Sequence, residues 1–324
     1  MSERKFATGT WVFGMVGDRF LLSGYRKGLD VLERIASIAE IEGISGVELL
    51  YPADFADGVD RVDEAIEGTG LDCAAVGVDL AGDPRWKFGS LSSKDARIRN
   101  EAIELIKNGM DVASSLGTKR VNIWPGQDGY DYAFEVDYSN SWEWFVEGIS
   151  SAASYRSDVL LCVEYKPREP RIRSLIDTSA RALLLCNEVG LGNVGVTVDI
   201  GHAIQAGENI AEVIHMLSRA RKLFHIHLND NRGGWDDDMI LGSVRLVEFL
   251  EMVDALDRVG YDGWLSVDVY PYREDPQKVV AESVSFFAFL DRLLERIGKE
   301  AIDQARKGDD PVSIFSTIRK ALSV

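Results

Sequence analysis

The sequence has few cysteines, few histidines and no long apolar run. Its three cysteines, Cys73, Cys162 and Cys186, share no spacing typical of a metal site, which predicts reduced thiols in a cytoplasmic protein. No stretch reaches the roughly 18 apolar residues that a membrane span needs, and no apolar segment near the N-terminus resembles a secretory signal. We therefore expect a cytoplasmic protein that makes no membrane contact.

Positive charge is also scarce. The chain has 36 Lys and Arg residues against 53 Asp and Glu residues, and its formal net charge is −17. Such a charge repels both the phosphate backbone of nucleic acids and an anionic lipid surface. Neither is an expected partner, and the balance favours a small neutral or cationic ligand.

Short apolar segments alternate along the chain with longer amphipathic ones. Eight segments are typical of strands and cover residues 6–13, 43–51, 72–80, 120–126, 158–166, 194–202, 223–230 and 262–270. The segments between them, such as 27–41 and 95–117, carry apolar residues at helical spacing. This alternation predicts an α/β protein, a single (β/α)8 TIM barrel. An open, doubly wound sheet is the alternative, and the lack of a glycine-rich phosphate motif after the first strand disfavours it.

We expect one catalytic domain with a helical extension. Residues 1–294 form the predicted barrel, whose last helix lies in the stretch ESVSFFAFLDRLLERIG. Residues 295–324 form a predicted helical tail that packs on the barrel or on a partner subunit. The tail therefore favours an oligomer, which we expect to be a homo-oligomer.

Polar side chains stand near the C-terminal ends of the last four predicted strands. Side chains alternate along a strand, so where flanking apolar residues face the helices, the polar residue between them faces the barrel interior. Glu164, Asp199, His227 and Asp268 should then converge on the face where TIM barrels hold their active sites. Three carboxylates this close need a cation or shared protons. With one imidazole among them, they suit Mn²⁺, Mg²⁺, Co²⁺ or Zn²⁺.

Other polar residues lie close to this group in the sequence. His202 follows Asp199 by three residues, and Asp236 and Asp238 alternate in the stretch WDDDM after the seventh strand. Such an alternating pair can direct two carboxylates at one ion, whereas the alternative is a solvated acidic loop. His225 faces the interior one layer deeper than His227, and we expect it to be a hydrogen-bonded core residue.

The chain resembles the xylose isomerase-like superfamily of TIM barrels, and most closely its L-rhamnose isomerase branch. The resemblance covers about residues 40 to 290 and rests on VEYKPREPR, VTVDIGHAIQAGENI, FHIHLNDN, WDDDMILGS, DVYP and WKFGSLSSKDARIRNEAIELI. It implies a divalent-metal-dependent sugar isomerase or epimerase, most often with Mn²⁺. Such an enzyme abstracts a proton next to the carbonyl of a metal-chelated sugar and proceeds through an enediolate.

The resemblance also implies roles for individual residues. The family's first metal site, which chelates adjacent sugar oxygens, is matched by Glu164, Asp199, His227 and Asp268. The second site, which takes part in proton transfer, is matched by His202, Asp236 and Asp238. Lys166 matches a lysine that stabilises charge at the carbonyl end of the sugar. Apart from the resemblance, Trp124 ends the fourth predicted strand, where it either stacks on the apolar face of a sugar or packs at the barrel mouth. Catalytic roles are expected for Glu164, Lys166, His202 and Asp268, and substrate contacts for Trp124, Lys166 and His202.

One feature departs from the aldose isomerases of the superfamily, which open the sugar ring with a histidine early in the barrel. Every histidine here lies at position 202 or beyond, and the third strand offers Asp79 instead. The ketose epimerases use two glutamates across one metal, whereas the second acid here is Asp268. These departures favour a substrate with an open carbonyl, as in the catalytic subunits of C-glycoside deglycosidases. Those enzymes work with a small second subunit and eliminate the aglycone of a 3-oxo-glycoside, so lyase chemistry is the alternative.

Two further classes are disfavoured. A DNA-repair endonuclease of the same superfamily needs more histidines and a basic groove, which this acidic chain lacks. A non-catalytic barrel should have lost some ligands, whereas all seven candidate positions keep residues that can bind metal.

Overall fold

The computed structural model describes residues 4–169, 172–308 and 310–323, so the last two residues of VEYKPREPR lie outside the described residues. Eight parallel strands form a closed barrel in the order β1-β10-β9-β8-β6-β4-β3-β2. They are β1 (Lys5–Gly9), β2 (Ile44–Tyr51), β3 (Asp72–Asp79), β4 (Arg120–Trp124), β6 (Leu160–Glu164), β8 (Val194–Asp199), β9 (Leu223–Leu228) and β10 (Trp264–Val267). The predicted (β/α)8 barrel is confirmed.

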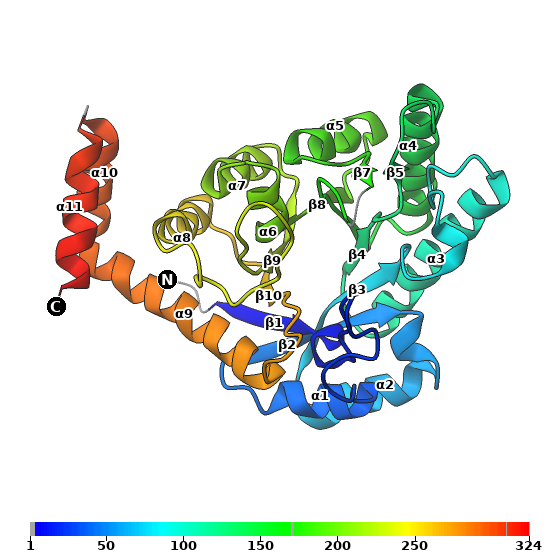
Figure 1. Cartoon of the computed structure of the whole chain (residues 1–324), viewed down its shortest axis with the longest axis horizontal. Helices are drawn as coiled ribbons and strands as arrows, with labels where there is room; N and C mark the ends of the chain where they lie inside the picture. Colours follow the sequence, from blue (N-terminus) through cyan, green and yellow to red (C-terminus); the bar gives the residue numbers. More distant parts are fainter. Residues whose placement is uncertain (1–3, 170–171, 309, 324) are drawn as a thin grey trace.

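Helices surround this barrel on the outside (Figure 1). They are α1 (Val31–Ala39), α2 (Val59–Thr69), α3 (Ala96–Ser115), α4 (Tyr138–Tyr155), α5 (Ser179–Val189), α6 (Ile200–Gln205), α7 (Ile210–Arg219), α8 (Val247–Val259) and α9 (Pro276–Ile297). Local sequence fixes their starts: Asp30 and Glu33 form a capping box on α1. The loops contain three short 3-10 turns, η1 (Thr10–Phe13), η2 (Ala53–Phe55) and η3 (Pro84–Trp86). They also contain an antiparallel pair of short strands, β5 (Gly129–Tyr130) and β7 (Arg173–Ser174).

Apolar strand residues pack between the barrel and the helices. Val196 and Val198 on β8, like Ile226 and Leu228 on β9, are fully buried, as the alternation of side chains predicts. The register of these two strands sets Asp199 opposite His227, at the C-terminal end of the barrel. A packed core on one side of each strand thus fixes the direction of the polar side chains on the other.

The first predicted strand, 6–13, is shorter in the structure. β1 ends at Gly9, and the chain continues as the 3-10 turn η1. A Cβ atom on Gly9 would overlap the indole of Trp11, so glycine allows the turn to fold back over the strand end. The turn carries Trp11 to the mouth of the barrel.

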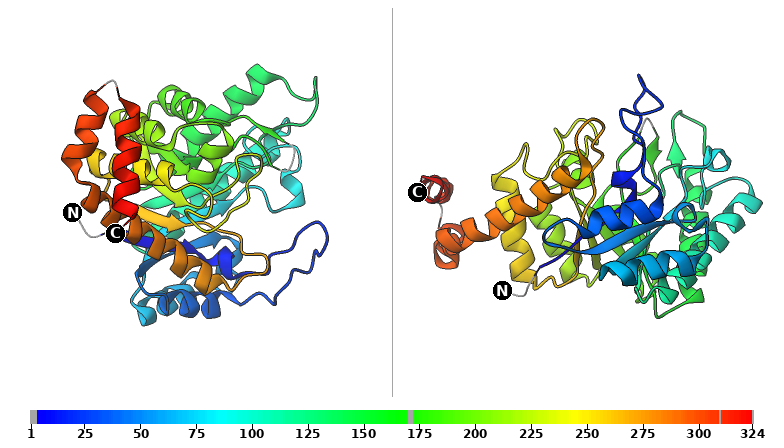
Figure 2. Two further views of the ribbon diagram at one scale, coloured as in Figure 1. Left: turned by 60° about the vertical axis from the view of Figure 1, so that its left-hand side comes forward. Right: turned by 90° about the horizontal axis from the view of Figure 1, so that it is seen from below.

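The C-terminal helices α10 (Lys299–Lys307) and α11 (Pro311–Leu322) extend beyond the barrel from the end of α9 (Figures 1 and 2). α9 itself runs without a break across the expected boundary at 294/295. Salt bridges of 2.5 Å from Arg306 to Asp254 and 2.6 Å from Arg258 to Asp303 join α10 to α8. The predicted C-terminal helical extension is therefore present.

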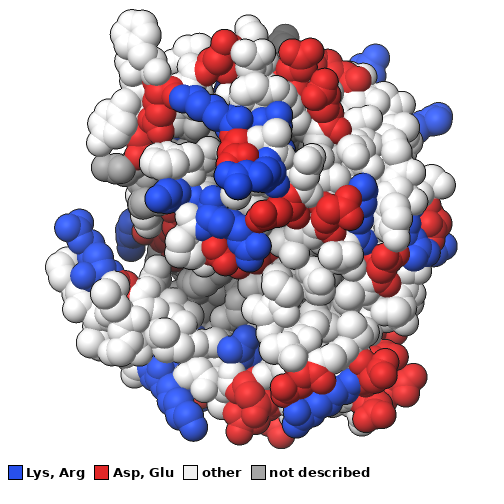
Figure 3. Space-filling model, turned by 90° about the vertical axis from the view of Figure 1, so that its right-hand side faces the viewer, with Lys and Arg blue, Asp and Glu red and all other residues white. Residues whose placement is uncertain are grey.

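The surface shows no segregation of charge on the face drawn in Figure 3, where basic and acidic side chains are interspersed. None of the described helices is long and apolar enough to cross a membrane. Cys73, Cys162 and Cys186 are all free and buried, and burial raises the pKa of each thiol.

Candidate metal centre at the mouth of the barrel

Four polar side chains from separate strands meet at the C-terminal end of the barrel. Glu164 ends β6, Asp199 ends β8, His227 is the last residue but one of β9, and Asp268 follows β10. One ligand atom from each lies within 4.8 Å of the others. We call this group the first cluster. It consists of the same four residues that the sequence pattern predicts to converge.

The imidazole of His227 faces the three carboxylates. Its Nδ1 atom lies 3.0 Å from Asp268 Oδ2, 3.5 Å from Glu164 Oε2 and 3.9 Å from Asp199 Oδ2. Within the described part of the chain, this buried nitrogen has no hydrogen-bond partner of good geometry. Buried nitrogens are rarely left unpaired, and a nitrogen among three carboxylates is a donor set that suits a divalent cation.

Asp199, His202 and Asp236 form a second cluster, whose ligand atoms also lie within 4.8 Å of one another. The Asp199 side chain caps α6 by accepting the His202 N–H at 2.9 Å, which places His202 one turn along. His202 Nε2 lies 3.1 Å from Asp236 Oδ2, and its Nδ1 lies 3.3 Å from Glu164 Oε1. The two clusters thus share Asp199 and are in contact through Glu164.

Asp238 lines a cavity that opens over the two clusters, but it is not a member of the second cluster. Its φ of 45° is uncommon for a residue with a side chain. The Tyr270 N–H donates to the Asp238 carbonyl at 3.1 Å, and Asn229 donates to its carboxylate at 3.3 Å. These two hydrogen bonds therefore hold Asp238 beside the cavity in this uncommon backbone conformation.

Each side chain of the first cluster has a partner that the sequence analysis did not assign to it. Glu164 accepts from Asn122 at 2.7 Å, Asp199 from Asn229 at 2.9 Å and Asp268 from Trp11 at 2.7 Å, while His227 Nε2 lies 3.4 Å from Glu48 Oε2. Asn122 and Asn229 were detectable, because they follow the same alternation on β4 and after β9. Gly201 lets Asn229 approach, since a Cβ atom there would overlap the amide.

Lys166 and Trp124 lie together at the cavity wall. The Lys166 ammonium lies 4.7 Å from the centre of the Trp124 ring and 2.6 Å from Asp236 Oδ2, and it also pairs with Glu169. Burial opposes the charged form of Lys166, but Asp236 and Asp238 outweigh it and raise its pKa. The structure therefore keeps a cationic amine beside an aromatic face.

His225 lies one layer below His227 and is fully buried. Its Nε2–H donates to Glu48 Oε1 at 2.6 Å. The expectation of a hydrogen-bonded core histidine is confirmed, although its partner on β2 was not foreseen.

Crowding shifts the ionisation of both clusters. Burial, reinforced by Asp236 and Glu164, raises the pKa of Asp199 to about 7. Burial acts likewise on Glu164, but the imidazole of His227 outweighs it and lowers the pKa of Glu164 to about 2. The pKa of His227 is raised well above its usual range because Glu164 and Glu48 outweigh burial. The centre thus retains protons near neutral pH.

This retention predicts a pH-dependent metal affinity. A metal ion must displace the protons held by Asp199 and His227, whose pKa values are raised in the folded protein. We expect the affinity for Mn²⁺ to rise about tenfold per pH unit, for each proton released, between about pH 6 and about pH 7. Calorimetric titrations in buffers of different ionisation enthalpy measure both the affinity and the proton count. Equal affinities at the two pH values, with no proton release, would contradict the expectation.

A cavity of about 790 Å³ opens over the two clusters. Besides ligands of both clusters, its wall contains Lys166 and Asp79 and the larger side chains Trp11, Met15, Trp124, Tyr270 and Tyr272. The segment between η1 and α1 projects beside the mouth (Figure 2). The volume lies in the range of about 300–1,000 Å³ typical of sites for small organic ligands.

Comparisons with known proteins identify the family of this barrel. Residues 35–290 match the model of the family described as xylose isomerase-like TIM barrel. The chain is 29% identical over 293 residues to xylose isomerase from Thermus thermophilus, covering 86% of this chain and 76% of that protein.

Solved structures show the same fold at lower identity. L-ribulose 3-epimerase is 17% identical, with a TM-score of 0.71 and coverage of 91% of this chain and 98% of that chain. The 3-keto-D-glucoside 4-epimerase from E. coli is 18% identical, with a TM-score of 0.68 and coverage of 88% and 99%, respectively.

Proposed function

Because this chain belongs to the xylose isomerase-like TIM-barrel family, we propose that it is a divalent-metal-dependent sugar isomerase or epimerase. The observation that carries the proposal is the convergence of three carboxylates on the unpaired Nδ1 of His227, at the floor of the cavity. The quoted sequence stretches favour the L-rhamnose isomerase branch. A cytoplasmic location agrees with the three free thiols.

The side chains of the first cluster fit a divalent cation. Its three carboxylates and one imidazole make a mostly oxygen donor set, which suits Mn²⁺ first and Mg²⁺, Co²⁺ or Zn²⁺ as alternatives. His202, Asp236 and Asp238 could hold a second ion beside it. A cation bound at the first cluster would offset the negative charge that develops on two neighbouring sugar oxygens.

The chain's own residues supply the remaining chemistry. Glu164 and Asp268 both line the cavity, so either carboxylate can accept the proton from the carbon next to the carbonyl. The electron pair of that C–H bond forms the enediolate, and the Lys166 ammonium offsets the charge on the former carbonyl oxygen. Returning the proton to the neighbouring carbon gives isomerisation, while the hydroxyl proton of that carbon moves to the former carbonyl oxygen with His202 as a further proton carrier. In epimerisation, the other carboxylate delivers a proton to the opposite face of the same carbon.

Trp124 and Lys166 are the proposed substrate contacts. The indole offers an apolar face on which the C–H side of a sugar ring can stack, and the ammonium lies next to it. His202 lines the same cavity and can donate to a sugar hydroxyl. Together, these groups orient the carbon chain across the first cluster.

Elimination of an aglycone from a 3-oxo-glycoside is the second candidate, and the cavity favours it. The lining includes Trp11, Met15, Tyr270 and Tyr272, which offer an apolar wall to an aglycone. At the end of β3, Asp79 accepts N–H groups of its own loop and no histidine is present. A ring-opened or oxidised sugar needs no such histidine. In this case the electron pair of the enediolate forms a C=C bond to the anomeric carbon, whose bond to the aglycone breaks. The aglycone carbon leaves with the electrons of that bond and takes up the abstracted proton, and the enzyme would work with a small second subunit rather than as a homo-oligomer.

Conversion of a substrate panel tests the proposal. Aldoses, ketoses and 3-oxo-glycosides are incubated with the protein in Mn²⁺ or in excess chelator, and products are followed by NMR. We expect at least one sugar to be converted only with Mn²⁺, and the product distinguishes isomerisation, epimerisation and elimination. Undiminished conversion in excess chelator would contradict metal dependence.

A further inference from the structure

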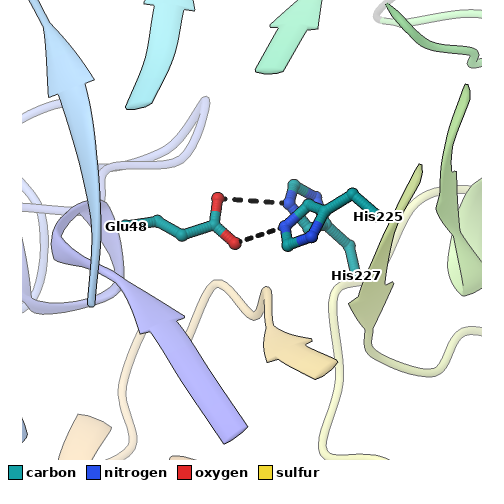
Figure 4. Close-up of side chains that lie close together, drawn as sticks. All are labelled: Glu48, His225 and His227. Atoms are coloured by element: carbon teal, nitrogen blue, oxygen red, sulfur yellow. Dashed lines mark hydrogen bonds and ion pairs between the residues drawn. The ribbon is translucent and has the colours of Figure 1, made fainter. Parts of the chain in front are cut away.

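A buried carboxylate lies beneath the first cluster. Glu48 stands in the middle of β2, is fully buried, and points across the barrel interior towards β9 (Figure 4). Its Oε1 atom lies 2.6 Å from Nε2 of His225, and its Oε2 atom lies 3.4 Å from Nε2 of His227. Within the described residues, these imidazoles are its only ion-pair partners. A buried charge with so few partners is costly unless these hydrogen bonds compensate for its desolvation.

The two bonds define which imidazole nitrogens carry hydrogen. An ionised carboxylate only accepts, so each Nε2 that faces it must be the N–H donor. The 2.6 Å bond from His225 is slightly shorter than the roughly 2.7–2.9 Å of charge-assisted N–H···O bonds, and it anchors the carboxylate. Its other oxygen is then held under His227, whose ring lies nearly perpendicular to that of His225 at an angle of 81°.

The opposite nitrogen of His227 is the one that faces the first cluster. Nδ1 is buried, has no hydrogen-bond partner among the described residues, and lies 3.0 to 3.9 Å from three carboxylate oxygens. We propose that Glu48 is a positioning residue, which fixes the Nε2–H tautomer and the ring orientation of His227 so that Nδ1 is offered to a metal ion. The inference rests on the proposed metal site and not on the identity of the sugar.

Glu48, His225 and His227 could themselves surround an ion, because their ligand atoms lie within 4.8 Å of one another. The geometry favours hydrogen bonds. Two ligands of a tetrahedral zinc ion are separated by about 3.3 Å, given bonds of about 2.0–2.1 Å, whereas Glu48 and His225 approach to 2.6 Å. An ion there would also use Nε2 of His227 and withdraw that residue from the first cluster.

The wild-type protein gives the most direct test. In ¹⁵N-histidine-labelled protein loaded with Zn²⁺, long-range ¹H–¹⁵N spectra report which ring nitrogen carries hydrogen and which binds metal. We expect His227 to be bound through Nδ1 with hydrogen on Nε2. Metal on Nε2 of His227 would overturn the proposal, and this arm needs no variant and no substrate.

Variants test the same inference through metal affinity. Glu48→Gln is expected to weaken Mn²⁺ binding by about 10- to 100-fold, the usual effect of losing a group that orients a metal-binding histidine. Glu48→Asp keeps the charge on a side chain one methylene shorter, so its carboxylate lies farther from His227. Its Mn²⁺ affinity should fall between those of Glu48→Gln and the wild type. Any activity should recover largely at saturating Mn²⁺, because the positioning of a ligand and not a reacting group has been altered.

A matched control removes another buried carboxylate. Asp128 lies outside both clusters and accepts hydrogen bonds from Ser90 and Ser92. The substitution Asp128→Asn should therefore leave the affinity for Mn²⁺ unchanged. A wild-type affinity for Mn²⁺ in folded Glu48→Gln would overturn the proposal. Loss of one bound ion per chain at saturating metal would also overturn it, because Glu48 would then bind an ion itself. Failure of the proposed sugar chemistry alone would leave the spectra and the affinity series intact, so the two failures are distinguishable.

Discussion

Alanine in place of Asp199 or His227 is expected to remove the bound divalent ion and the activity together. The two side chains face each other across β8 and β9, and both are almost fully buried. Removing either one leaves three of the four candidate ligands, and in His227→Ala these are three carboxylates with no imidazole among them. Metal affinity should fall by more than about 100-fold, since losing even an orienting partner outside the ligand set reduces affinity by about 10- to 100-fold.

Metal content after dialysis and the rate of sugar conversion measure this loss. His215→Ala is the matched histidine control, because His215 is exposed on α7. Asp237→Ala is the matched acid control, since the Asp237 carboxylate accepts only the Arg232 N–H among its described hydrogen bonds. Both controls should keep wild-type metal content. Full activity in either Asp199→Ala or His227→Ala would remove the first cluster from the mechanism.

Methionine in place of Lys166 is expected to keep the metal and lose most of the rate. The side chain is buried against Trp124, and methionine fills a similar volume without the charge. The ammonium is proposed to act only where charge develops on the carbonyl oxygen. Its loss should therefore lower kcat by about 10²- to 10³-fold, as for removal of one donor to a developing oxyanion.

The separation of rate from metal binding is the discriminating feature of Lys166→Met. Steady-state kinetics at saturating Mn²⁺ give kcat and KM, and dialysis gives metal content. Lys87→Met, at an exposed lysine, serves as the control and should match the wild type. An unchanged kcat in Lys166→Met would exclude Lys166 from catalysis.

The sequence predicted the placement of the first cluster because period-two alternation acts locally. Each member stands near the end of a strand whose neighbouring apolar residues face the helices, so the direction of the polar side chain follows. A closed parallel barrel then brings the strand ends together. Asp199 and His227 meet through strand register, which the pattern of buried valines and leucines fixes on both sides.

Partners from distant elements were not accessible in the same way. Glu48 lies between apolar residues in the stretch GVELL of β2, and its contact with His225 crosses the barrel between residues 177 apart in sequence. Trp11 lies in a segment that resembled a continuation of the first strand, yet the 3-10 turn after Gly9 turns its indole to Asp268. Such contacts depend on barrel closure and loop conformation, which local patterns do not encode.

The incorporation of solvent deuterium tests the central claim most directly. The protein, with Mn²⁺ and a converted substrate from the panel, is incubated in D₂O, and the product and the recovered substrate are analysed by NMR and mass spectrometry. Proton abstraction next to the carbonyl predicts deuterium at that carbon or its neighbour, lost in Asp199→Ala and suppressed by chelator. Complete conversion with no deuterium on carbon in either compound would contradict the account.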